Sequence, residues 1–203
     1  MRQVSGFPWL LLPGDFRRRQ GVEEATQRGL QLFVMPVWVG AGFADWWCHR
    51  RSDIEHTAGA TESAIHLTMM AESSLPTLLG LFCEVNAGML AVTYGTLAVH
   101  ELTAIADVAN ADGRREVTPV EQYVHGFLGR VPMMATMLLT VLHWDQAQAA
   151  VTSRGRPDWR IRLKRRPLSR AYRASVLAAA GALAATYAEE LARCVRAASA
   201  NPK

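Results

Sequence analysis

The chain has few cysteines and lacks the motifs of several common enzyme classes. Its three cysteines, Cys48, Cys83 and Cys194, are an odd and widely spaced set without a Cys-x-x-Cys pair. Such a set argues against a disulfide framework and against a thiolate zinc site, and it favours a reducing compartment. There is no glycine-rich phosphate loop, no Gly-x-Ser-x-Gly elbow and no His-Glu-x-x-His motif. His100-Glu101 starts the last motif, but Ala104 stands where its second histidine would be.

Long uncharged runs are also lacking, although 50% of the residues are hydrophobic. None of the runs free of charged residues and histidine reaches the ~18 residues expected of a membrane span. The longest are 29–44, 85–99, 131–142 and 174–188. An apolar patch at Phe7–Leu12 precedes Arg17–Arg19, which is the wrong order for a secretory signal. We expect a cytoplasmic protein or one peripheral to the membrane, with an integral membrane protein as the alternative.

Hydrophobic periodicity and turn signals predict an all-α protein, an up-down-up-down antiparallel four-helix bundle with an additional C-terminal helix. The segment 118–121, Thr-Pro-Val-Glu, has the order of a capping box. Asn86-Ala87-Gly88 predicts a tight hairpin, and Pro36 and Pro76 predict bends. The expected helices are 22–50, 61–84, 88–109, 119–150 and 168–198. The expected parts are a bundle with a metal site (1–150), a basic connector (151–172) and a C-terminal helix packed on the bundle (173–203).

The connector is strongly basic. Residues 154–173 hold nine Arg or Lys and one acidic residue, Asp158, and 159–164 alternate apolar with basic side chains. This pattern suits a membrane surface, and a solvated linker or a basic edge strand is the alternative. We do not expect nucleic acid as a partner. The alanine-rich last helix suits close packing on the bundle or a homo-oligomer contact.

Three acidic residues precede a histidine by four positions, where random placement would give roughly half such a pair. Positions four apart share one face of a helix, so each pair points a carboxylate and an imidazole the same way. A fourth segment adds His100 and Asp107, also on one face. In the predicted bundle all four sets fall at the same end. We therefore predict a metal site formed by Asp45, His49, Glu62, His66, His100, Asp107, Glu121 and His125.

Mixed histidine and carboxylate ligands suit non-haem iron, with zinc or manganese as alternatives. Four carboxylates would balance two divalent ions, which favours a di-iron centre for redox or oxygen chemistry on a small molecule. Glu55, Glu72, Glu101, Arg50 and Arg115 could support the ligands. A zinc or manganese hydrolase is the second option, and haem held by two histidines is disfavoured by the carboxylate beside each one. A membrane-associated structural or adaptor protein is the non-enzymatic alternative, in which the acidic residues cap helices.

This ligand pattern resembles that of the di-iron carboxylate helix bundles, the ferritin-like proteins and their relatives. Those bundles use Glu-x-x-His and a long crossover between their second and third helices, so the resemblance is chemical and implies no shared fold. Separately, DWWCHRRSDIEHTAG, ESAIH and RREVTPVEQYVH resemble a group of small uncharacterised bacterial helical proteins. Some of that group are labelled cyclic-dinucleotide synthases. This chain has no GG[DE]EF motif, and the resemblance implies no activity.

Overall fold

The computed structural model describes residues 16–152 and 155–200, and they form an all-helical structure, which confirms the predicted class. The apolar patch at Phe7–Leu12 lies outside the described residues. The helices are α1 (Phe16–Gly29), η1 (Leu30–Val34), α2 (Met35–Arg51), η2 (Ile54–His56), α3 (Gly59–Phe82), α4 (Ala87–Ala111), α5 (Pro119–Leu142), α6 (Trp144–Val151) and α7 (Arg170–Ala200).

The first long helix is continuous from α1 through η1 into α2, and Pro36 determines its irregular turn. Proline has no N–H to donate to the carbonyl four residues earlier, and its ring crowds that carbonyl. The chain accommodates this with a π-helical segment, η1, immediately before α2. A π turn of this kind is a common way to absorb such a defect inside a helix.

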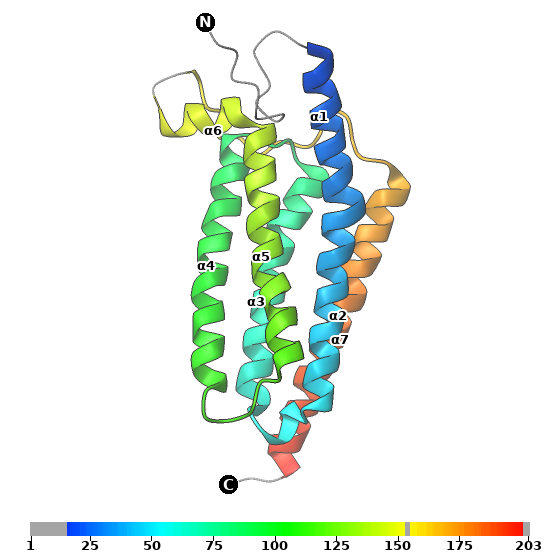
Figure 1. The fold of residues 1–203 in the computed structure, drawn as a ribbon, viewed down its shortest axis with the longest axis vertical. Coiled ribbons are helices and arrows are strands. Elements are labelled where there is room, and N and C mark those ends of the chain that lie inside the picture. The colour runs from blue at the N-terminus through cyan, green and yellow to red at the C-terminus, as the bar shows by residue number, and fades with distance from the viewer. Residues whose placement is uncertain (1–15, 153–154, 201–203) are drawn as a thin grey trace, which may run out of the picture.

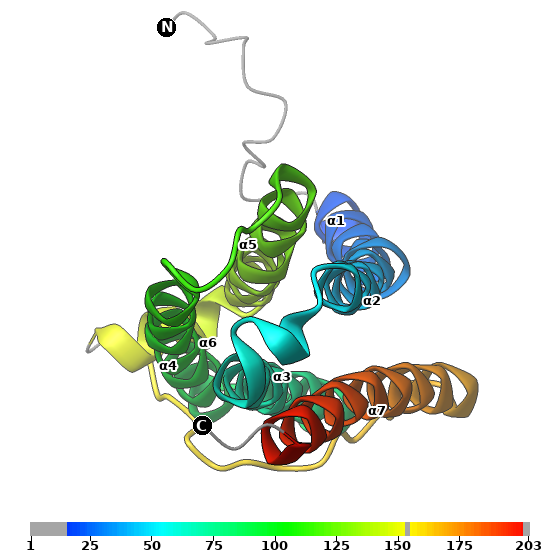
Figure 2. The ribbon, with the colours of Figure 1, turned by 90° about the horizontal axis from the view of Figure 1, so that it is seen from below.

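The five long helices form a ring. Helix α2 contacts α5, α5 contacts α4, α4 contacts α3, α3 contacts α7, and α7 contacts α2 (Figure 2). The long helices run roughly along the longest axis of the molecule (Figure 1). The sequence predicts a C-terminal helix packed on the bundle, and α7 packs between α2 and α3 as part of the ring. Its side chains therefore reach the interior.

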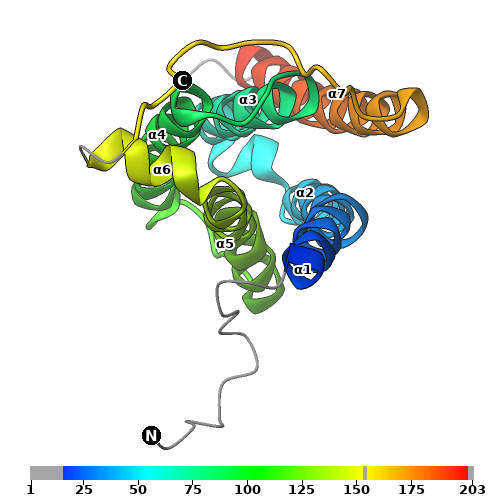
Figure 3. The same cartoon turned by 90° about the horizontal axis from the view of Figure 1, so that it is seen from above.

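Two predicted helix ends differ because tertiary contacts decide them. The expected helix 119–150 breaks at His143, whose N–H donates to Leu139 and Thr140 carbonyls, and α6 then turns across the end of the ring (Figure 3). The expected helix 61–84 stops at Phe82, because Cys83 is extended and forms an isolated bridge with Leu163.

The basic connector is held along the start of α4 by hydrogen bonds to the backbone. Gly88 N–H donates to the Asp158 carbonyl (3.0 Å), and the Asn86 amide donates to the Arg160 carbonyl (2.8 Å). A Cβ on Gly88 would lie 2.4 Å from the carbonyl oxygen of Trp159, so only glycine fits. The connector is therefore an ordered strap in its described part rather than a free linker.

Helices α4 and α5 present a large apolar outer face. Both are long and apolar enough to cross a membrane, and only 22% and 11% of their most apolar stretches are buried. A search for uncharged runs misses them because Glu101, Asp107, Glu121 and Arg130 interrupt the two sequences. The exposed apolar side chains on this α4–α5 face are Tyr94, Val99, Leu102, Ile105, Val108, Val120, Tyr123, Phe127, Met133, Met134, Met137 and Val141.

Candidate metal centre

One half of the candidate centre surrounds His49 near the end of α2. Its Nε2 lies 3.5 Å from Asp45 Oδ2 and 3.5 Å from Glu121 Oε1. His125 of α5 approaches the same aspartate, with its Nε2 2.8 Å from Asp45 Oδ1. His49 and Glu121 are fully buried and Asp45 nearly so. Asp45, His49 and His125 each place one ligand atom within 4.8 Å of the others, close enough to hold one ion.

The other half surrounds His66 near the start of α3. Its Nε2 lies 3.2 Å from Asp107 Oδ1 and 3.9 Å from Glu62 Oε1. Glu62, His66 and Asp107 form a second group of ligand atoms within 4.8 Å of one another, and all three are buried. The rings of His49 and His66 stack with centroids 4.3 Å apart, which places the two halves side by side.

Glu190 of α7 joins the two halves, and the sequence reasoning missed it. Its carboxylate oxygens lie 3.1 Å from His49 Nδ1 and 3.5 Å from His66 Nδ1. A histidine that binds a metal through one ring nitrogen usually donates the other N–H to such a carboxylate. Glu190 is suited to that role, because it leaves both Nε2 atoms facing the paired carboxylates. The only sequence signal was an acidic residue following the uncharged run 174–188.

Arg115 and Tyr187 complete the buried network. Arg115 Nη2 lies 2.5 Å from Glu62 Oε1 and 2.6 Å from Glu121 Oε1, so it links a carboxylate of each half. The Tyr187 hydroxyl donates to Asp45 Oδ2 (2.9 Å) and lies 3.1 Å from the Gly42 carbonyl oxygen. Arg115 was among the residues expected to orient a carboxylate, and its contacts agree with that expectation.

The buried carboxylates favour the protonated, positively charged form of the histidine beside them. Burial lowers the pKa of His66, but hydrogen bonds to Asp107 and Glu190 outweigh burial and raise that pKa to about 10. Burial raises the pKa of Glu190, and its contacts with His49 and His66 bring that pKa down to about 2. Opposite charges and hydrogen bonds to the charged form thus exceed the desolvation cost. The site therefore attracts cations, either protons on imidazole or metal ions.

The donor set fits two divalent ions. Among the described residues, the cluster holds five buried carboxylates and one arginine, Arg115, which pairs with two of them, Glu62 and Glu121; the other three are Asp45, Asp107 and Glu190. With neutral imidazoles, four negative charges remain, which two divalent cations would balance, whereas uncompensated buried charge is costly. Glu62 Oε2 and Glu121 Oε2 are buried without a hydrogen-bond partner among the described residues. Unpartnered buried oxygens are free to bind metal.

The predicted site residues do not all come together. His49, His66 and His125 lie with Asp45, Glu62, Asp107 and Glu121 at the end of the ring where α2 ends and α3 begins. His100 does not join them: its Nδ1 contacts Glu72 (3.3 Å) and Ser73 (3.4 Å) instead. His100 lies seven residues from Asp107, which is about 10 Å along a helix, so both cannot contact one ion.

The close contacts run between helices more than within the predicted pairs. Asp45 and His49 approach each other, but Glu121 lies against His49, and His125 lies against Asp45. Thr118 accepts the Glu121 N–H as the capping box predicts (3.3 Å). The Glu121 side chain, however, does not complete the box but extends into the cluster. Helix capping alone therefore does not explain this glutamate.

Comparisons with known proteins place this chain in no group. No protein-family model matches it. No curated protein matches it, and no solved structure matches it.

Proposed function

We propose that the chain is a helical metalloprotein whose His/carboxylate cluster binds two divalent ions, with iron as the preferred metal. The observation that carries this proposal is the burial of five carboxylates against one arginine, with both His Nε2 atoms facing carboxylate pairs. Asp45, His49 and His125 would hold one ion. Glu62, His66 and Asp107 would hold the other, and Glu121 contacts His49 and is linked to Glu62 through Arg115.

We infer redox or oxygen chemistry as the use of this centre. Sets of histidine and carboxylate with open positions suit non-haem iron, which supplies electron transfer and oxygen activation when bound. The chain's own contribution is to orient the imidazoles through Glu190 and to hold carboxylates with Arg115. Tyr187 donates to Asp45 and keeps one oxygen of that carboxylate in place. The antiparallel order expected of α2 to α5 supports the proposal, because it brings their contributions to one end.

Metal analysis of the protein, purified without oxygen or chelator, tests the proposal. We expect about two iron ions per chain, as the charge balance requires. Zinc or manganese at the same stoichiometry would support a hydrolase, in which the metal activates water. A chain that takes up no divalent metal would overturn both enzymatic proposals and leave the structural or adaptor protein.

We also propose that the protein associates with a membrane through the α4–α5 face. Side chains such as Leu102, Ile105 and Val141 are each about two-thirds exposed, and a water-exposed patch of that extent is unusual on a soluble monomer. Membrane fractionation with an alkaline carbonate wash tests this: retention supports contact with the lipid interior, and full release supports peripheral binding through 154–173. A homo-oligomer through α7 remains a prediction, and Ala182, Ala184 and Ala185 are exposed on it.

A further inference from the structure

An elongated cavity runs along the axis of the helix ring and leads to the candidate metal centre. Its larger part has a volume of about 690 Å³ and its smaller part about 320 Å³. Trp38, Ser73 and His100 line both parts, so the two meet at mid-height of the ring. The smaller part is also lined by Asp45 and His66 of the cluster. These volumes lie in the range of small-molecule sites.

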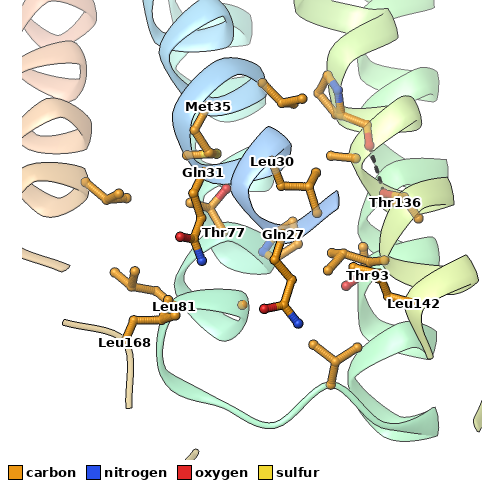
Figure 4. Close-up of a pocket in the computed structure, with 18 of the residues that line it drawn as sticks. Gln27, Leu30, Gln31, Met35, Thr77, Leu81, Thr93, Thr136, Leu142 and Leu168 are labelled. Carbon is orange, nitrogen blue, oxygen red and sulfur yellow. Dashed lines mark hydrogen bonds between the residues drawn. The ribbon is translucent and has the colours of Figure 1, made fainter. Parts of the chain in front are cut away.

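The wall of the larger part is mainly apolar. Figure 4 shows Leu30, Met35, Leu81 and Leu142 around it, together with Gln27 and Gln31. Four threonines also line it, but each hydroxyl donates to a backbone carbonyl one turn earlier in its own helix. These bonds are Thr77 to Ser73, Thr93 to Met89, Thr96 to Val92 and Thr136 to Pro132. Because these donors are already used, they offer little to a polar ligand, and the wall suits hydrocarbon.

The end of the cavity away from the cluster is basic. Lys164, Arg165 and Arg166 of the connector line it, and no described residue forms an ion pair with any of the three. Lys164 is half-buried, and burial lowers its pKa. Glu23 and Glu84 lie at the same end, where Glu84 Oε1 accepts the Arg165 backbone N–H (2.7 Å) and Glu23 Oε1 accepts the Gln27 amide (3.3 Å). Both carboxylates keep their negative charge, so three cations against two carboxylates leave this end with a net positive charge.

We propose that the axial cavity binds a single-chain amphiphile with an anionic headgroup, a long-chain carboxylate, with its headgroup at Lys164 and Arg165. Its hydrocarbon chain would follow the apolar wall toward His100. The stretch of α3 from Phe82 to His66 spans about 24 Å, a length that suits an extended chain rather than a compact metabolite. The inference deepens the proposed function, since it names the substrate class that would present its far end to the metal centre.

Binding to the metal-free protein tests the cavity independently of the metal. Saturable binding of dodecanoate and hexadecanoate is measured by calorimetry. Ala135→Phe fills the cavity wall and should weaken binding at least about tenfold. Met134→Phe is its control, because Met134 is exposed on the same helix and does not line the cavity. Equal affinity in the wild type and Ala135→Phe, or no saturable binding, would overturn the proposal.

The position of the headgroup is tested by comparing the binding of a charged and a neutral ligand. The double variant Lys164→Gln/Arg165→Gln should lose about tenfold in affinity for dodecanoate and keep its affinity for dodecanol, which has no charge. Arg156→Gln/Arg160→Gln, with both side chains exposed on the same connector and outside the cavity lining, should bind both ligands like the wild type. Loss of both ligands equally, or of neither, would contradict the headgroup position. Because no metal is present, failure here leaves the metal proposal standing, and the reverse also holds.

Discussion

At the scale of single residues, the sequence predicted the types of ligand better than their partners. Acidic residues four positions before a histidine correctly indicated side chains that face the interior, including Asp45, His49 and Glu62. The pairing of carboxylates with imidazoles depends on how the helices pack. Residue spacing within one helix does not predict such contacts between helices. His100 was wrongly grouped with Asp107, because a shared face says nothing of height along the helix. Glu190 was missed because Cys194, not a histidine, follows it by four positions.

Glu190→Gln tests the orienting role of this carboxylate. The substitution keeps the size of the side chain but removes the charge that holds the Nδ1 atoms of His49 and His66. We expect metal affinity to fall about 10- to 100-fold, as for other groups that orient metal-binding histidines. Competition with a chelator of known affinity measures the change. Glu189→Gln is the control, since Glu189 contacts Arg50 and Arg193 rather than the cluster. Equal affinities in the two variants would remove Glu190 from the site.

At the scale of elements, local signals predicted helix starts better than helix ends. Thr118 caps α5 by accepting the Glu121 N–H, as the capping box predicts, and Asn86, predicted as a turn residue, caps α4 in the same way. The ends at Phe82 and Leu142 depend on distant partners: Cys83 pairs with Leu163, and α6 packs against α4. Capping residues can therefore be recognised in the sequence, whereas the contact with the strap that ends α3 cannot.

Gly88→Ala tests the contact between the strap and α4. The added methyl would meet the Trp159 carbonyl at 2.4 Å, so the connector must shift and lose the hydrogen bond from Gly88. We expect a loss of about 1–3 kcal/mol in the free energy of unfolding, measured by denaturant titration. Gly95→Ala, in open space on the same helix, should instead stabilise by about 0.5–1 kcal/mol because alanine favours the helix. Similar effects at both positions would contradict a tight contact with the strap.

At the scale of the whole molecule, the interior is polar to an unusual degree. Among the described residues, fourteen hydrophobic and thirteen polar or charged side chains are buried. Buried charge must be paired, so the fold depends on its ionic cluster as well as on apolar packing. The sequence predicted the all-helical class from periodicity. It could not predict that α7 enters the ring, because an alanine-rich helix packs equally well inside or outside a bundle.

The pH dependence of the metal-free protein follows from the cluster. The pKa of His66 is raised from 6.5 to about 10, so its stabilisation is full below pH 6.5 and is lost as pH rises toward 10. The pKa of Glu190 is lowered from 4.5 to about 2, so its stabilisation is lost as pH falls below 4.5. We expect greatest stability between pH 4.5 and 6.5, measured by thermal unfolding across pH. His66→Gln should reduce the alkaline slope, and part of it should remain because the pKa of His125 is also raised, burial being outweighed by its hydrogen bond to Asp45. A wild type without that slope would contradict the ion pairs of His66.

Metal titration of Glu62→Gln tests the central claim most directly. Glu62 is fully buried, and its Oε2 has no hydrogen-bond partner among the described residues, so it is free to bind metal. Anaerobic titration with Fe²⁺, followed by the rise in unfolding temperature, should show about two ions bound and strong stabilisation in the wild type. In Glu62→Gln the metal-free stability should hold or rise, because carboxylate repulsion falls, while metal content and the stabilisation by metal drop sharply. Glu116→Gln, an exposed acidic neighbour of Arg115, should titrate like the wild type. Equal, small losses of stability in Glu62→Gln with and without Fe²⁺ would contradict the metal centre.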